Sequence, residues 1–234
     1  GPFNPWLMAM FPGSETAGCV PEGARIVELA WGEGWKEALA GLKAFDPGLL
    51  VSVRIPLRED APQMALALAQ GGVSVIHLEA TIDSLYHDNP NLHLKEGIRS
   101  VHLKLVEAQV RDEVTLLASG GLVMAEHVAK AIILGADAVF VDFPILIALE
   151  CRMCRRCRDG LSCPVEIETA SPGWVAARVT NLMGAWHNQL LEVMGAMGMR
   201  DARRCLAEQG RGIKGVVHAG NDQGGCSNLR KAVF

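Results

Sequence analysis

Four cysteines within thirteen residues are the part of this chain best suited to chemistry. Cys151, Cys154, Cys157 and Cys163 follow the pattern C-x2-C-x2-C-x5-C, and Pro164 comes directly after the last of them. Thiolates are soft ligands that hold iron–sulfur clusters and zinc. Bacterial ferredoxins use C-x2-C-x2-C-x3-C-P, in which three closely spaced cysteines grip one cluster. The spacing therefore favours an iron–sulfur cluster, and with it electron transfer.

Two other interpretations of the cysteines stay open. Zinc sites usually present two C-x2-C pairs set well apart, whereas here Cys154 would have to serve both pairs. Unliganded thiols are the third interpretation. Four arginines separate the cysteines: Arg152, Arg155, Arg156 and Arg158. They form either a solvated loop or a positive environment that stabilises the reduced cluster and raises its potential.

Length and composition limit the class of protein. The chain has 234 residues, which suggests one domain or one domain with a tail, and 50% of them are hydrophobic. A net charge of -4 gives no basic face for nucleic acid, and no apolar run is long enough to span a bilayer. Seven cysteines, an odd number with a tight quartet, predict metal binding in a reducing compartment, so we expect a cytoplasmic protein.

Short apolar segments alternate with segments of helical periodicity. The predicted strands are Pro5–Phe11, Ala24–Ala30, Leu49–Ile55, Val73–Leu78, Val114–Ala118 and Ala138–Val141. The predicted helices are Trp35–Ala44, Ala61–Gln70, Leu94–Val110, Met124–Leu134, Trp174–Met197 and Arg200–Gln209. Apolar strands alternating with helices indicate a parallel sheet that is covered on both faces. The short, regular spacing favours the βα units of a TIM-type barrel over a doubly wound sheet.

The predicted fold class is α/β, a partial TIM-type (β/α) barrel followed by an iron–sulfur loop and C-terminal helices. We divide the chain into a partial barrel (1–150), a cluster loop (151–170), C-terminal helices (171–210) and an irregular tail (211–234). A closed barrel needs eight strands. The chain also begins at Gly1 rather than Met. We therefore expect it to be part of a longer protein or of a complex, with an upstream half-barrel or a redox subunit as partner.

The segment from Leu116 to Ile167 resembles the end of the FMN-binding barrel of the glutamate synthase family. It reads LLASGGLVMAEHVAKAIILGADAVFVDFPILIALECRMCRRCRDGLSCPVEI. In that family a strand ending in Ser/Asp-Gly-Gly precedes a helix, a GAD-containing strand, a leucine-rich helix and the cluster cysteines. Weaker similarity runs back through VSVRIP and VPEGARIVELA. The resemblance implies an oxidoreductase that forms glutamate from 2-oxoglutarate and glutamine-derived ammonia.

The resemblance also implies a type of cluster. The family's usual centre contains three irons on three cysteines, and Cys151, Cys157 and Cys163 match those positions. Cys154 is an additional thiol, and the last spacing is one residue longer. A fourth thiolate gives a fourth iron its ligand, so we expect [4Fe–4S] rather than [3Fe–4S].

Flavin binding follows from the resemblance as well. Ser119, Gly120 and Gly121 match the turn whose backbone N–H groups face the FMN phosphate, at the carboxyl end of a barrel strand. The alternative is an ordinary βα turn. Arg54 stands where the family has a lysine that points at the flavin.

Three positions depart from the family's flavin site. Asp142 replaces a glycine of the second phosphate loop, where its charge would repel phosphate unless it turns away. The segment Ala80 to Asn91 replaces a glycine-rich loop, and Phe11 replaces a lysine. These departures leave a non-enzymatic electron-transfer or structural subunit as the second hypothesis, and a zinc-binding structural protein as the third.

His77 and Glu79 are a further pair of chemical interest. They lie two residues apart on a predicted strand, which places both side chains on one face. They form either an acid–base pair or, as is more common for such a histidine, a buried or rim position with no chemical role.

Overall fold

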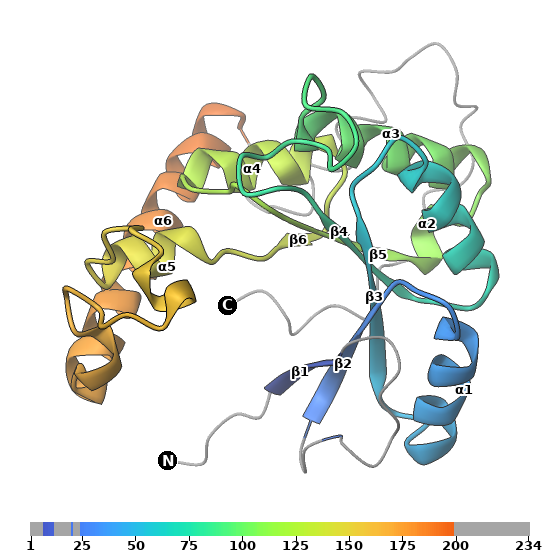
Figure 1. Ribbon diagram of the computed structural model, residues 1–234. Helices are drawn as coiled ribbons and strands as arrows, with labels where there is room; N and C mark the ends of the chain where they lie inside the picture. The colour runs from blue at the N-terminus through green and yellow to red at the C-terminus, as the bar shows by residue number, and fades with distance from the viewer. Residues whose placement is uncertain (1–6, 12–19, 21–23, 199–234) are drawn as a thin grey trace.

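The computed structural model describes residues 7–11, 20 and 24–198, which form a curved parallel sheet with helices along it (Figure 1). The strands are β1 (Leu7–Phe11), β2 (Ala24–Ala30), β3 (Leu50–Pro56), β4 (Val75–Glu79), β5 (Thr115–Ser119) and β6 (Ala138–Val139). The helices are α1 (Trp35–Phe45), α2 (Ala61–Gln70), α3 (Leu94–Glu107), α4 (Ala125–Leu134), α5 (Phe143–Ala148) and α6 (Pro172–Ala196).

The order of the strands in the sheet is their order in the chain. Each strand pairs in parallel with the next, from β1 to β6. Right-handed crossovers that always move one strand along place their helices on the same side. Helices α1 to α4 accordingly line the outer side of the sheet, as in part of a (β/α) barrel (Figure 1). The predicted fold class, a partial TIM-type barrel, is confirmed.

The outer face of the sheet is the hydrophobic core. Alternate residues of β2 to β5 point to this face, and they pack against Leu42 of α1, Leu68 of α2 and Leu105 of α3. These strand residues are all apolar and buried: Val27, Leu29, Val51, Val53, Ile55, Ile76, Leu78, Leu116 and Ala118. We expected a sheet covered on both faces, but in the described part of the chain α1 to α4 cover the outer face alone.

The inner face of the same strands carries a series of polar side chains. They are Glu28 on β2, Ser52 and Arg54 on β3, His77 and Glu79 on β4, and Ser119 on β5. The register places Glu28 beside Ser52, Arg54 beside His77, and Glu79 beside Ser119. Because side chains alternate between faces, this register brings all six to the interior side of the curved sheet.

Most element boundaries agree with the sequence prediction. Strand β2 and helix α2 have the predicted bounds, while β6 has two residues instead of four. Helix α3 ends at Glu107 rather than Val110. Gln109 there adopts a left-handed φ of 60°, and the Val110 N–H donates to the Leu105 carbonyl, which closes the helix. The predicted helix Arg200–Gln209 and the tail 211–234 lie outside the described residues.

Helix α6 packs against α4 and α5 (Figure 1). Ser171 caps it by accepting from the Trp174 N–H at 3.3 Å. Met194 is buried against Ile132 of α4. Arg178 donates from Nε to the Ala148 carbonyl at 2.6 Å, which ties α6 to α5. These contacts fix both ends of the segment that contains the four cysteines.

Candidate functional site

A chain of hydrogen bonds crosses the inner face from β2 to β5. His77 Nδ1 lies 2.6 Å from Glu28 Oε2, and His77 Nε2 lies 2.7 Å from Ser119 Oγ. Glu28 is 1% exposed and His77 5%, whereas Ser119 is only half-buried at the end of β5. Residues separated by 49 and 42 positions are thus joined by the sheet register alone.

Arg54 places a positive charge beside the Glu28 carboxylate of this hydrogen-bond network. Its Nε lies 3.3 Å from Glu28 Oε1, and its Nη1 donates to Glu79 Oε1 at 2.5 Å. A buried carboxylate without such a partner would be strongly destabilising. Of the two interpretations of His77, the less favoured one, an acid–base pair with Glu79, is wrong, because the acid bonded to His77 is Glu28 and Glu79 bonds Arg54. The prediction of His77 as a buried position is confirmed.

The turn Ser119-Gly120-Gly121 fits an anion through its backbone. Gly120 and Gly121 have left-handed φ values of 103° and 65°. Among the described residues, their N–H groups donate to no acceptor. A Cβ on Gly120 would clash with the Ala80 backbone, and one on Gly121 with Ser84. Only glycine therefore suits these positions, and two free N–H groups can receive a phosphate oxygen.

The second phosphate position has different chemistry. Asp142 is exposed and precedes α5, and its Oδ1 accepts from the Phe143 N–H at 2.7 Å. The carboxylate thus accepts from the first N–H of α5. Arg54, the predicted flavin contact, is held by two carboxylates. The residues present fit the phosphate turn but do not reproduce the second phosphate loop or a free cation toward the flavin ring.

The cysteine loop follows α5 directly. Cys151 and Cys163 are half-buried and Cys154 and Cys157 exposed, all four as free thiols. Within the described residues, no three side chains of His, Cys, Asp or Glu are arranged to hold a metal ion. The loop thus carries four thiols, and no three of them are gathered around a common point.

Two of the thiols already have N–H partners. The Met153 N–H donates to Cys151 Sγ at 3.4 Å. Backbone N–H groups around Cys163 lower the pKa of its thiol. The N–H of Ile167 has the largest effect, followed by those of Val165 and Glu166. Hydrogen bonds to sulfur favour the thiolate, which is the form that binds metal. The chemistry of the donor set therefore fits an iron–sulfur cluster.

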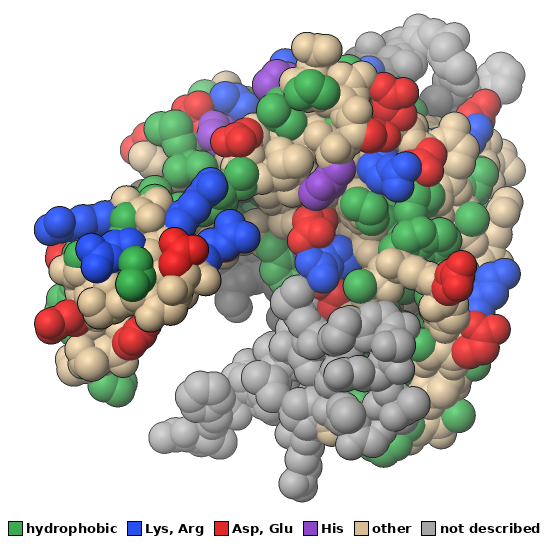
Figure 2. Space-filling view, viewed as in Figure 1, with side chains coloured by type: hydrophobic (Ala, Val, Ile, Leu, Met, Phe, Trp, Pro, Cys, Tyr) green, Lys and Arg blue, Asp and Glu red, His purple; other side chains and the backbone are tan. Residues whose placement is uncertain are grey.

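The backbone of the loop is unusual. Glu150, Met153, Arg155 and Glu166 all have φ between 49° and 64°, a left-handed conformation that non-glycine residues rarely adopt. Strain of this kind collects at binding and active sites. The four arginines of the loop are exposed, and Figure 2 shows Lys and Arg side chains gathered over this segment, at the left of the view.

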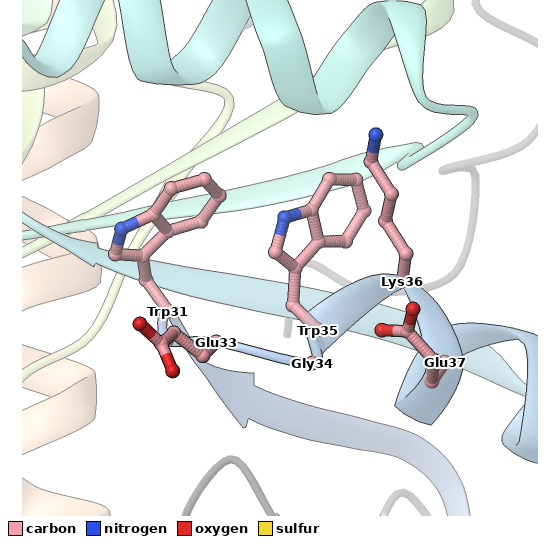
Figure 3. Close-up of a pocket in the computed structure, with 7 residues that line it drawn as sticks. Trp31, Glu33, Gly34, Trp35, Lys36 and Glu37 are labelled. Carbon is pink, nitrogen blue, oxygen red and sulfur yellow. The ribbon is translucent and has the colours of Figure 1, made fainter.

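A cavity of about 550 Å³ that the sequence did not predict lies between β2 and α1. Trp31 and Trp35 project to the same side of the segment, with ring centroids 5.9 Å apart (Figure 3). Glu33, Lys36 and Glu37 complete the lining with Gly32 and Gly34. The two tryptophans four residues apart were the available signal. None of the predicted site residues lines this cavity.

Solved structures with a similar fold have little sequence identity to this chain. Two mandelate oxidase structures, one of them with a monooxide FMN adduct, share this fold at TM-scores of 0.53 and 0.52. Their sequences are 16% and 17% identical to this chain, and each comparison covers 79% of this chain and 54% of the oxidase. This likeness concerns the fold alone.

The chain belongs to the glutamate synthase family. The model of the conserved region in glutamate synthase matches residues 25–200. The archaeal glutamate synthase [NADPH] of Methanocaldococcus jannaschii is 31% identical over 180 residues, which cover 71% of this chain and 35% of that protein. The ferredoxin-dependent glutamate synthase of Pyropia yezoensis is 25% identical over 182 residues, 72% of this chain and 12% of that protein. The chain thus spans about a third or less of these relatives. None of the described helices is long and apolar enough to cross a membrane.

Proposed function

We propose that this chain is an electron-transfer module of a glutamate-synthase-type oxidoreductase. The observation that carries the proposal is the cysteine loop, which combines four free thiols with N–H donors to the sulfurs of Cys151 and Cys163. The matches to relatives named as NADPH- or ferredoxin-dependent glutamate synthases support a redox role. Cys151, Cys154, Cys157 and Cys163 hold a [4Fe–4S] cluster in this proposal.

The exposed arginines of the loop contribute to the function of the cluster. Their positive charge favours the reduced, more negative cluster and so raises its potential. Cys151 and Cys163 lie at the two half-buried ends of the loop, while Cys154 and Cys157 lie in its exposed part. Loading the cluster then requires the exposed pair to fold inward onto the half-buried pair.

The flavin is a separate part of the proposal. The N–H groups of Gly120 and Gly121, which have no acceptor within the described ranges, bind the FMN phosphate, and the bound flavin would supply hydride and single-electron chemistry. Ser119 closes the turn through its bond to His77. The Arg54 guanidinium is paired with Glu79, so it adds positive charge near the site but is not free to contact the flavin directly.

One observation favours a second candidate, a non-enzymatic subunit with a cluster and no flavin. Arg54 is paired with two carboxylates, and the carboxylate of Asp142 takes the N–H that starts α5. The Asp142 carboxylate disfavours a second contact with the FMN phosphate. The pairing of Arg54 leaves it with no free charge for the flavin ring. A third candidate, a zinc-binding structural protein, uses the same four thiols.

A visible spectrum after anaerobic reconstitution with iron and sulfide separates the three candidates. Flavin bands above a broad brown absorption support the first, and brown colour without flavin supports the second. A colourless protein that contains zinc contradicts both. Cys154→Ser tests the cluster type, because unchanged iron content and spectrum would rule out four-thiolate ligation. Ser162→Ala, a change of an exposed residue in the same loop, is the matched control.

The partner follows from the edges of the sheet. Among the described strands, β1 and β6 each have one neighbour, so both edges offer unpaired backbone groups. The proposal assigns the remaining barrel strands to an upstream half-barrel, in the same protein or in a redox partner subunit.

A further inference from the structure

We infer that Ser119 is an activated nucleophile, and that Glu28, His77 and Ser119 together catalyse acyl transfer from a carboxylic ester. The hydrogen bonds have the order of a nucleophilic triad: a carboxylate bonds Nδ1 of the imidazole, and Nε2 of the same ring bonds the hydroxyl. This activity goes beyond the proposed redox function and makes no use of the cysteine loop.

The geometry suits His77 as a general base. With its Nδ1–H donated to Glu28, Nε2 carries a lone pair that accepts the Ser119 hydroxyl proton at an Nε2–Oγ distance of 2.7 Å. The ring cannot easily turn, because it is 5% exposed and its centroid lies 4.6 Å from that of Phe140. Arg54 Nε lies 3.3 Å from the other oxygen of Glu28, an ion pair without a hydrogen bond among the described residues. The tautomer that the reaction needs is therefore held in place.

The position of Ser119 suits a substrate. Ser119 is the last residue of β5, half-buried, at the carboxyl end of the strands where barrel enzymes place their active sites. The next two residues, Gly120 and Gly121, have N–H groups that donate to no acceptor in the described part of the chain. Free backbone N–H groups beside a nucleophile can stabilise the oxyanion of a tetrahedral intermediate.

The reaction proceeds in two balanced steps. Ser119 Oγ attacks the ester carbonyl, His77 Nε2 takes the hydroxyl proton and passes it to the departing alkoxide, and an alcohol leaves an acylated serine. Water then attacks the acyl carbon, His77 takes one of its protons and returns it to Ser119, and a carboxylic acid leaves. An FMN phosphate on the same N–H groups would compete with the ester, so acyl transfer belongs to the flavin-free protein.

A fluorophosphonate probe distinguishes an activated serine from one that only satisfies a buried histidine. The 234-residue chain is incubated with the probe, and labelled peptides are mapped by mass spectrometry. The exposed Ser162 serves as the internal reference. General-base assistance is worth about 10²–10⁴ in rate, so Ser119 should react at least about 100-fold faster than Ser162. Equal rates, or labelling of Ser162 alone, would overturn the inference.

Variants separate catalysis from folding. Glu28→Gln keeps the size of the side chain but removes its charge, and we expect labelling of Ser119 to slow by about tenfold or more. Ser119→Ala removes only a hydroxyl and should abolish the burst of p-nitrophenol from p-nitrophenyl acetate, with an unchanged circular dichroism spectrum. A burst that persists in a folded Ser119→Ala protein contradicts the triad. A brown protein with an inert Ser119 contradicts only this inference. A colourless protein with a reactive Ser119 contradicts only the redox proposal.

Discussion

At the scale of single residues, the inner face and the cysteine loop use charge in different ways. On the inner face, the Arg54 guanidinium lies at short range between the carboxylates of Glu28 and Glu79, and His77 lies between a carboxylate and a hydroxyl. In the loop, exposed arginines surround thiols that have few partners. The first arrangement holds side chains in fixed positions, whereas the second leaves donors available for a ligand.

Cys163 is expected to be the most reactive thiol of the metal-free loop at low pH. Backbone N–H groups, led by that of Ile167, lower the pKa of this thiol, and the thiolate is the form that alkylates. Iodoacetamide labelling followed by peptide mapping should modify Cys163 at a lower pH than the exposed Cys154. A common pH profile for both thiols would contradict this prediction.

Replacing Arg54 tests the buried charge of Glu28. Arg54→Ala leaves a carboxylate that is 1% exposed without its cation, and we expect a loss of about 3 kcal/mol in the free energy of unfolding. The control is Arg58→Ala, because Arg58 lies 3.7 Å from both Asp60 and Asp88 on the surface, where such pairs contribute about 1 kcal/mol or less. Equal midpoints in urea for the two variants would argue against an essential ion pair at Glu28.

At the scale of elements, α3, α4 and the turn before β5 are joined at the opposite end of the sheet from the candidate site. Arg111 donates to the carbonyls of Val114 and Gly135 and to Asp137 Oδ2 at 2.8 Å. Asp137 Oδ2 also accepts from the Leu116 N–H at 2.7 Å. In (β/α) barrels this end serves stability, and the contacts here are of that kind.

His102 makes this junction sensitive to acid. Burial, together with Arg111 and Arg99, lowers the pKa of His102 to about 4 from an ordinary value of 6.5. Between these values the unfolded chain binds more protons than the folded one, so stability falls as the pH decreases from about 6.5 to 4. His102→Asn keeps an acceptor for Arg111 and removes the titration. Urea unfolding should then show about 1–2 kcal/mol less loss between pH 7 and pH 4, allowing for solvent screening.

The opposite result for His102 is easily recognised. If the wild type and His102→Asn lose stability in parallel as the pH falls, His102 is not the group responsible. The acid sensitivity would then lie in the carboxylates.

The sequence predicted elements well and contacts between distant strands poorly. The apolar strand ARIVELA and the helix APQMALALAQ have the predicted bounds, because local periodicity and turn residues determine them. Glu79 was the acid considered as a partner for His77 because both share a strand, but the pairing with Glu28 depends on the register of three strands. A signal was present in the sequence. Three mostly apolar strands each contain a charged or imidazole side chain: Glu28, Arg54 and His77. The four cysteines lie close together in the sequence, so they could be identified as candidates without knowing the strand register.

At the scale of the whole molecule, the partial barrel has two edges that other strands can extend. Among the described residues, nothing pairs with the outer edges of β1 and β6. Unpaired edges promote association. Native mass spectrometry should find the chain bound to a second polypeptide or, when it is isolated, in species heavier than 25.1 kDa. A stable 25.1 kDa monomer at tens of micromolar concentration would contradict the incomplete barrel as a driving force for assembly.

Neighbouring strands in this sheet are also neighbours in the chain, from β1 to β6. Each βα unit can therefore dock onto the preceding one as soon as it leaves the ribosome, without waiting for distant sequence. A break in the gene between two units would cut the polypeptide at one ladder and leave the others intact. The same sequential order that lets the molecule grow from its first strand to its last would thus let a barrel be inherited as separate pieces that reassemble edge to edge.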